Sequence, residues 1–380
     1  MRCHAIAFAF EVKFCISRSP EHIPSVKITF LVAAASAIAF LAPLHAQDAN
    51  YQIFVSDEHS GNLTVISGSD LQPVATFPVG KRPRGIHASP DGKTIYVAVS
   101  GTPIEAPPKL DANGNPIFAK GHDDDDDDQA KADKAADGII VVDVASRKVL
   151  RKIPANSDPE QFAVSADGAR LYIANEDSGV ATILNVANDK IEHMMKVTRE
   201  PEGVGVAPDG KTFYVTCETG GDCFCFDAAT AKELAHFTVH PRPRSIDFLP
   251  DGSRAFIPSE SSGELNIIDC AQHAVTQVVP LPKGARPQCI RVSPDGQKIY
   301  ASGGRSGAVY VLSPSGQLLN TIPVGKRPWG LTLSPDGKRL FVANGPSEDV
   351  SVIDLATEKE ITRVKCPGGP WGVVCVPSSN

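Results

Sequence analysis

The amino-acid sequence predicts an all-β fold, namely a seven-bladed β-propeller. A turn sequence recurs, four strand-like segments fill each repeat, and a proline opens seven repeats. The turn is Ser-Pro-Asp-Gly or a close variant, at residues 89–92, 165–168, 207–210, 249–252, 293–296 and 334–337. Its aspartates are 76, 42, 42, 44 and 41 residues apart, so the first interval is one period plus an insertion of about 34 residues. A period near 42 residues with four strands is typical of propeller blades.

Residues 201–238 illustrate how one repeat is built. Apolar residues alternate or run together in four segments, at residues 202–207, 212–217, 223–227 and 233–238. Pro208-Asp-Gly separates the first two segments and suits a type I turn, because proline presets φ and glycine accepts the positive φ that follows. Period-two patterning between turn residues predicts four antiparallel strands in a meander.

Seven prolines open the innermost strands, at Pro83, Pro159, Pro201, Pro243, Pro287, Pro328 and Pro370. The last of them begins a single strand at residues 370–376, after which the chain ends. Three segments near the start, at residues 51–56, 63–67 and 74–79, have no opening strand of their own. We therefore expect one C-terminal strand and three N-terminal strands to complete the seventh blade and close the ring, which removes exposed sheet edges.

The repeats extend through one predicted domain, residues 47–380, with an Asp-rich loop insertion at residues 101–138. Residues 1–46 are expected to be an N-terminal extension and a signal peptide. Lys27 precedes an apolar run at residues 28–44, and Leu44-His-Ala46 resembles a cleavage site. The alternative is a membrane anchor, but the run is short and lacks stop-transfer charges. We expect a periplasmic or secreted protein, without stable membrane insertion after the signal is removed.

The net charge of −7 argues against a nucleic-acid partner, which would favour a basic surface. Signal removal leaves seven cysteines, an odd number, and Cys217 and Cys223 flank a hairpin loop where a disulfide is one interpretation. Small buried sheet residues are the favoured alternative. A thiolate metal site formed by Cys217, Cys223 and Cys225 lacks a fourth ligand at the usual spacing. No covalent haem motif occurs, and no cofactor is expected.

Charged and aromatic residues flank the opening prolines, at the predicted mouth of the central channel. Such a ring predicts a site for a small anionic ligand or for a protein partner. The alternative is a set of mutually neutralising ion pairs that hold adjacent blades in register. Matching loops between the second and third strands add Glu58, Glu176, Glu218 and Glu260. The candidate binding residues are Arg82, Arg84, Glu160, Glu202, Arg242, Arg244, Arg286, Arg327, Trp329 and Trp371.

Two other features could hold chemistry. The insertion contains His122 followed by six aspartates, and His122, Asp123 and Asp125 are the candidates for binding a hard cation. The EF-hand spacing is absent, and a solvated acidic loop is the favoured alternative. His87 on an innermost strand could act as a ligand or a base, but packing is its commoner role. The spacing defines no catalytic residues.

The strand sequences Tyr96-Val-Ala, Tyr172-Ile-Ala-Asn, Tyr214-Val-Thr and Phe341-Val-Ala-Asn resemble the YVTN β-propeller repeat family. The order of Val79-Gly-Lys-Arg-Pro-Arg-Gly, Asp158-Pro-Glu, Ala174-Asn-Glu-Asp, Glu200-Pro-Glu-Gly and Pro370-Trp-Gly-Val-Val resembles an exported subgroup associated with pyrroloquinoline-quinone-dependent alcohol catabolism. The sequence departs from this pattern at the Asp-rich insertion and at Cys217, where the preceding blade has Asn175. The resemblance implies a periplasmic accessory or binding protein.

Three functions follow as hypotheses. The first is a non-catalytic, monomeric scaffold or ligand-binding protein that uses the loop face with the Arg/Glu ring. The second is a lactonase-like hydrolase, because sugar lactonases are related seven-bladed propellers. The third is a redox protein that holds a non-covalent cofactor at the channel mouth. The fold alone does not choose among them.

Overall fold

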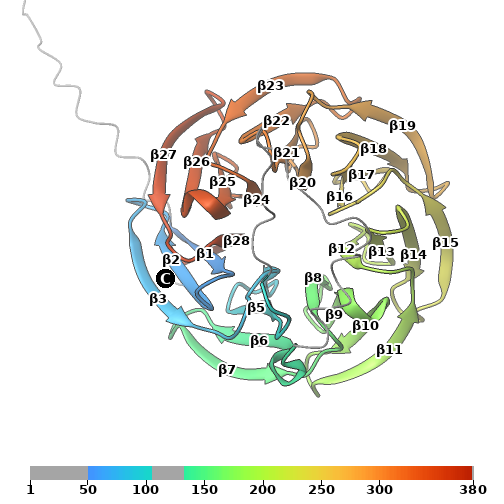
Figure 1. The fold of residues 1–380 in the computed structure, drawn as a ribbon, viewed down its shortest axis with the longest axis horizontal. Coiled ribbons are helices and arrows are strands. Elements are labelled where there is room, and N and C mark those ends of the chain that lie inside the picture. Colours follow the sequence, from blue (N-terminus) through green and yellow to red (C-terminus); the bar gives the residue numbers. More distant parts are fainter. Residues whose placement is uncertain (1–49, 105–131, 379–380) are drawn as a thin grey trace, which may run out of the picture. The chain divides into compact units, whose positions relative to one another are not determined.

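Seven four-stranded antiparallel sheets form a closed ring around a central channel (Figure 1). The computed structural model describes residues 50–104 and 132–378. The predicted fold class is therefore confirmed. Residues 1–49, and with them the expected signal peptide, lie outside the described residues, as do His122, Asp123 and Asp125.

The first three blades each contain four consecutive strands, which run in chain order from the inner to the outer edge of the sheet. Blade 1 consists of β4 (Ile86–Ala88), β5 (Thr94–Val99), β6 (Gly138–Asp143) and β7 (Lys148–Ile153). Blade 2 consists of β8 (Pro159–Val164), β9 (Arg170–Asn175), β10 (Val180–Asn185) and β11 (Lys190–Lys196). Blade 3 consists of β12 (Pro201–Val206), β13 (Thr212–Cys217), β14 (Asp222–Asp227) and β15 (Glu233–Thr238). The strands expected within residues 201–238 match blade 3 to within one residue at each end.

Blades 4 to 6 repeat the same order. Blade 4 consists of β16 (Asp247–Phe248), β17 (Arg254–Ser259), β18 (Glu264–Asp269) and β19 (Ala274–Pro280). Blade 5 consists of β20 (Pro287–Val292), β21 (Ile299–Gly303), β22 (Ala308–Leu312) and β23 (Leu318–Pro323). Blade 6 consists of β24 (Pro328–Leu333), β25 (Arg339–Asn344), β26 (Asp349–Asp354) and β27 (Lys359–Lys365). Short 3₁₀ helices are η1 (Lys134–Ala136), η2 (Glu176–Ser178) and η3 (Gly345–Ser347).

Blade 7 joins the two ends of the repeat region. Its inner strand is β28 (Pro370–Pro377), followed by β1 (Tyr51–Asp57), β2 (Asn62–Ser67) and β3 (Pro73–Pro78). Strand β28 pairs antiparallel with β1 from Tyr51–Pro377 to Asp57–Pro370. The predicted closure by one C-terminal and three N-terminal strands is therefore present, and it leaves every inner strand with a neighbouring blade on both sides.

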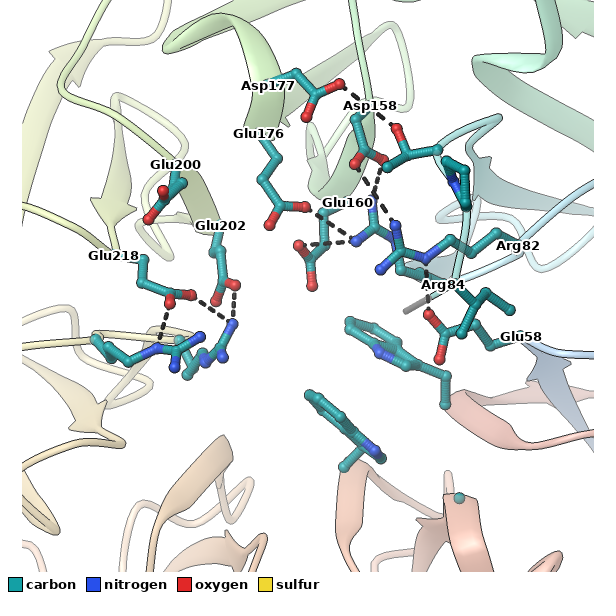
Figure 2. A pocket seen from close by; sticks show the side chains of 18 of the residues that line it. Glu58, Arg82, Arg84, Asp158, Glu160, Glu176, Asp177, Glu200, Glu202 and Glu218 are labelled. Atoms are coloured by element: carbon teal, nitrogen blue, oxygen red, sulfur yellow. Dashed lines mark hydrogen bonds and ion pairs between the residues drawn. The ribbon is translucent and has the colours of Figure 1, made fainter. Parts of the chain in front are cut away.

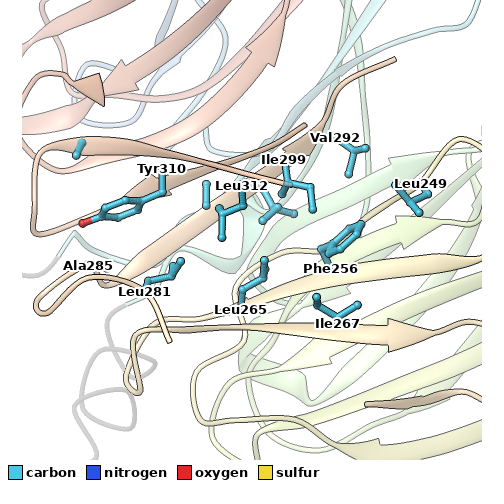
Figure 3. Packing of buried hydrophobic residues seen from close by; sticks show 13 residues of the cluster. Leu249, Phe256, Leu265, Ile267, Leu281, Ala285, Val292, Ile299, Tyr310 and Leu312 are labelled. Atoms are coloured by element: carbon cyan, nitrogen blue, oxygen red, sulfur yellow. The ribbon is translucent and has the colours of Figure 1, made fainter. Parts of the chain in front are cut away.

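Among the described residues the hydrophobic core forms seven clusters, and each lies between two neighbouring blades. Figure 3 shows the cluster between blades 4 and 5, where Phe256 and Leu265 of one sheet pack against Ile299 and Tyr310 of the next. Alternate side chains of each strand point to opposite faces of the sheet, so one blade contributes to two clusters. Apolar packing between blades therefore holds the ring and leaves the mouth free for polar residues.

The described cysteines are all free thiols, and all seven lie within or against the apolar clusters. The Cys217–Cys223 disulfide is absent, because strand register places Cys223 opposite Thr216 and Cys217 opposite Asp222. Cys217 packs toward blade 2, whereas Cys223 and Cys225 pack toward blade 4. Their position on opposite faces of the sheet also argues against the thiolate trio as a metal site.

In the part of the chain that the structure describes, no helix is long and apolar enough to cross a membrane.

Candidate functional site

A cavity of about 900 Å³ occupies the channel mouth, and we call it the mouth cavity. It is enclosed by the blade-opening residues, by the loops between second and third strands, and by Thr102–Ile104 at the base of the insertion. The cavity is large enough for a small-molecule ligand. Nine of the ten residues expected from the sequence line it: Arg82, Arg84, Glu160, Glu202, Arg242, Arg244, Arg327, Trp329 and Trp371. The tenth, Arg286, does not line it and donates to the carbonyl oxygen of Ser261 at 3.3 Å.

The residue before each opening proline adopts a left-handed backbone conformation. Six of these residues are charged and one is Gly369, and their φ angles lie between 43° and 74°. Such φ values cost a residue with a side chain about 1 kcal/mol or more, so glycine is the usual choice. Charged side chains in these positions flank the mouth in six blades: Arg82, Asp158, Glu200, Arg242, Arg286 and Arg327. The same conformation occurs in outer hairpins such as that of Leu71, so it is not by itself a sign of function.

Arg84 is the centre of an ion-pair network between blades 1 and 2 (Figure 2). Its guanidinium group contacts Asp158, and its Nη1 lies 3.1 Å from Glu160 Oε2 and 3.0 Å from Glu176 Oε2. The side chain is only 2% exposed. Burial alone lowers the pKa of Arg84, but the charges of these three carboxylates and of Glu58 more than offset burial and raise it. Arg84 therefore stays positively charged and links blades 1 and 2 through its ion pairs.

Arg244 forms a second network between blades 3 and 4. Its Nη1 contacts Glu202 and lies 2.7 Å from Glu218 Oε2, while its Nε lies 2.7 Å from Glu260 Oε2. Arg242 contacts Glu218 as well, and its Nε is 3.8 Å from Glu260. Arg82 completes the first network through Glu58 at 3.0 Å. These four arginines already have carboxylate partners, as the ion-pair interpretation of the ring predicts.

The two networks do not balance in charge. Four arginines contact seven carboxylates: Glu58, Asp158, Glu160, Glu176, Glu202, Glu218 and Glu260. Crowded, buried carboxylates favour their neutral forms. Burial, and then the negative charge of Glu160, raises the pKa of Glu176 to about 8. Burial also raises the pKa of Glu218 to about 8, with Glu176 and Glu260 adding to the effect against Arg242.

The opposite part of the mouth is aromatic. The rings of Trp329 and Trp371 stack with centroids 5.6 Å apart and an interplanar angle of 25°. The guanidinium carbon of Arg327 lies 4.7 Å from the centroid of the Trp329 ring. Within the described residues, Arg327 has no carboxylate at ion-pair distance. The mouth cavity therefore combines a carboxylate-rich wall with a flat apolar wall that carries a cation outside the ion pairs.

The sequence placed Glu176 and Glu218 on matching loops but contains no sign of their high pKa values, which arise first from burial and, for Glu218, also from carboxylates of the neighbouring blades. The insertion replaces a loop between a second and a third strand, which places it on the face of the mouth, and its base lines the cavity through Thr102–Ile104. There, Lys134 contacts Asp177, and Asp137 accepts hydrogen bonds from Gly101 N at 2.8 Å and Asp158 N at 3.2 Å. The first and last residues of the insertion therefore support the wall of the site.

His87 takes the packing role that the sequence favoured. Its ring meets that of Phe162 edge-on at a centroid distance of 4.8 Å. Burial, followed by the nearby charge of Arg291, lowers the pKa of His87 to about 4, so the ring is neutral at pH 7. His87 is not among the residues that line the mouth cavity.

Comparisons with solved structures show the same fold. A protein from Bacteroides uniformis, provisionally named a 6-phosphogluconolactonase, has a TM-score of 0.68 at 17% identity, covering 86% of this chain and 100% of that chain. A functionally unknown protein from Desulfotomaculum acetoxidans gives 0.68 at 14% identity, covering 87% and 100%. Hydrazine synthase of Kuenenia stuttgartiensis gives 0.62 at 19% identity, covering 81% and 92%. At these identities the likeness concerns the fold alone.

The family comparison covers most of the chain. None of the curated proteins matches the sequence. Two overlapping segments, residues 47–206 and 198–365, match the family described as lactonase, 7-bladed β-propeller. The protein therefore belongs to the lactonase 7-bladed β-propeller family.

Proposed function

We propose that the mouth cavity binds and hydrolyses a small lactone, the second of the three functions considered from the sequence. The observation that carries the proposal is Glu218, a buried carboxyl in the cavity wall with a pKa near 8 beside Arg242. A general base works best when its pKa lies near the working pH. Family membership and the likeness to the Bacteroides uniformis protein support this reaction class.

Each step of the reaction has a candidate group. Glu218 in its ionised form takes a proton from water as the water oxygen attacks the lactone carbonyl carbon. Arg242, whose Nε contacts Glu218 and Glu260, donates from its guanidinium group to the developing oxyanion. The ring C–O bond then breaks, and the ring oxygen takes the proton from Glu218. The product is the open-chain hydroxy acid.

The aromatic wall provides binding rather than chemistry. Trp329 offers a flat apolar surface to a ring-shaped substrate, and Arg327 above it can pair with a negative group on that substrate. An anionic group of the ligand is then held by Arg327, while Arg82, Arg84 and Arg244 support the walls through their ion pairs.

A pH-stat assay tests the proposal with δ-gluconolactone and a phosphorylated sugar lactone, after subtraction of the spontaneous rate. We expect Glu218→Gln to lower kcat by about 100-fold or more. Arg327→Ala is expected to raise KM for the phosphorylated lactone about tenfold and to change KM for the neutral lactone little. Glu233→Gln, an exposed change on β15, is the matched control. Hydrolysis no faster than the spontaneous rate, or full activity in Glu218→Gln, contradicts the proposal.

A non-catalytic binding role is the second candidate, favoured by the nine expected residues that meet around one cavity. In this case the protein is an exported, monomeric scaffold accessory to periplasmic alcohol catabolism. Thermal-shift measurements with small sugar acids and alcohol-oxidation products test it: stabilisation without turnover supports binding alone.

The absorbance spectrum of the purified protein tests the redox alternative. Mass spectrometry of the exported chain tests periplasmic or secreted location, with a mature start at Gln47 as the expected result.

A further inference from the structure

Three glutamate side chains converge at the inner end of the mouth cavity (Figure 2). Glu160 comes from β8, Glu176 from η2 and Glu202 from β12, so blades 2 and 3 both contribute. One carboxylate oxygen from each lies within 4.8 Å of the other two. Glu160 and Glu202 are buried, which removes the water that would otherwise screen their charges.

The side-chain oxygen of Gln288 is a second observation, separate from the three glutamates, that indicates a bound ligand. Gln288, on β20, lines a smaller cavity of about 30 Å³ together with Glu160 and Glu202. Its side chain is buried, with 5% exposure, and among the described residues its Oε1 has no hydrogen-bond partner. A buried carbonyl oxygen without a donor is unfavourable unless another group satisfies it. The cavity is large enough to hold at least one water-sized group, so a single ion fits.

Two arginines contact the three glutamates of the cluster. Arg84 contacts Oε2 of Glu160 and of Glu176, and Arg244 contacts Oε1 of Glu202. No hydrogen bond from these arginines to the second oxygen of Glu176 or of Glu202 is found among the described residues. Three carboxyl groups and two arginines, Arg84 and Arg244, therefore meet in this cluster, and converging acceptor oxygens suit a cation rather than another anion.

We propose that Glu160, Glu176, Glu202 and the Oε1 atom of Gln288 form a calcium site between blades 2, 3 and 5. Ca²⁺ prefers carboxylate and amide oxygens and accepts six to eight ligands in flexible geometry, with water completing the set. The site connects three blades through one ion, at the inner end of the mouth cavity. The inference goes beyond lactone hydrolysis, because Ca²⁺ binding is measured without substrate and stands or fails separately.

Calorimetric titration of CaCl₂ into the full chain, purified and treated with EGTA, tests the site. We expect one Ca²⁺ per chain. Glu160→Gln and Glu202→Gln should each weaken binding by about tenfold or more, and Gln288→Leu by about fivefold without any change of charge. Glu58→Gln is the matched control, because it removes one negative charge from the same cavity outside the cluster. Its affinity should stay within about twofold of wild type.

Thermal denaturation with and without about 1 mM CaCl₂ shows which variants fold. Ca²⁺ should raise the melting temperature of the wild type and of Glu58→Gln, and raise that of Gln288→Leu less. Gln288→Leu keeps the proposal testable if a glutamate variant fails to fold. The absence of both heat and thermal shift in the wild type overturns the proposal. Equal weakening by Glu58→Gln and Glu160→Gln also overturns it, because that result indicates diffuse attraction to an acidic cavity.

Discussion

Acidic residues occur at both ends of the blades, at the Asp-Gly turns and at the channel mouth, but they bind different kinds of partner. At the turn end, Ser and Asp two residues apart form the same hydrogen bond in four blades, as in Ser89 Oγ to Asp91 Oδ1 at 2.6 Å and Ser334 Oγ to Asp336 Oδ1 at 2.6 Å. At the mouth, acidic residues bind partners far away in sequence, and Arg84 meets Glu176 across 92 residues. The turns are exposed and repetitive, whereas the mouth is buried and differs between blades.

This difference separates local from non-local causes. An aspartate that bonds to its neighbours in a turn depends on a few adjacent residues, so each repeat specifies its own turn. The mouth carboxylates depend on which blade lies beside them and on how much water the ring excludes. Because they are buried, the ion pairs of the mouth are expected to contribute more to the free energy of unfolding than the hydrogen bonds of the turns, which solvent weakens.

The largest expected effect comes from Arg84→Ala, which leaves Asp158, Glu160 and Glu176 without their shared partner. Removal of one member of a buried ion pair typically destabilises a protein by about 3–5 kcal/mol. Arg286→Ala is the matched control, because Arg286 likewise adjoins an opening proline but donates to a backbone carbonyl instead of a carboxylate. Urea denaturation should show at most about 1 kcal/mol for the control. Equal losses of unfolding free energy in the two variants would contradict the view that an arginine paired with buried carboxylates matters more than one bonded to a backbone carbonyl.

The next effect concerns the pH dependence of stability at Glu218. Its pKa rises from 4.5 to about 8 on folding, so between these values the folded chain retains a proton that the unfolded chain loses. This contribution is fully present below pH 4.5 and is lost as pH rises through 8. Glu218→Gln, which remains neutral, should lose less stability than the wild type between about pH 5 and pH 8.5. Parallel melting curves for the two proteins across this range contradict the assignment.

A smaller effect is expected at the turn end. Asp336→Ala removes hydrogen bonds from Ser334 Oγ at 2.6 Å and from Lys338 N at 3.1 Å, both at a turn that solvent reaches. We expect a loss of about 1 kcal/mol in urea denaturation. Asp336→Asn, which keeps an acceptor oxygen, should recover most of it. A loss as large as that of Arg84→Ala would contradict the view that turns act locally.

The smallest effect tests independence of the two ends. The double variant Arg84→Ala/Asp336→Ala should lose the sum of the two single losses to within about 0.5 kcal/mol, because the sites share no partners among the described residues. Arg84→Ala/Glu160→Gln should deviate from additivity, because the two side chains are 3.1 Å apart. Additive behaviour in the second pair would show that the mouth network is not coupled.

The sequence predicted most of the fold, because the causes act within each repeat. The expected strands of blade 3 and the closure through β28 and β1 both occur in the structure. It also predicted which residues surround the mouth, since a fixed repeat places equivalent positions on one face. Arg286 is the exception: it occupies an equivalent position in the repeat, yet its side chain donates to Ser261 and does not line the cavity.

The sequence alone determined that the chain forms seven blades, because turns, strand patterning and the offset between the two ends are local or countable features. Only the tertiary structure decided that the arginines of the mouth neutralise glutamates, and that Glu160, Glu176 and Glu202 converge beside Gln288. Those properties depend on side-chain directions and on burial between blades. The spacing of residues in the sequence predicts neither the side-chain directions nor the burial. Both arise when ring closure brings the blades together and removes the water around their charges.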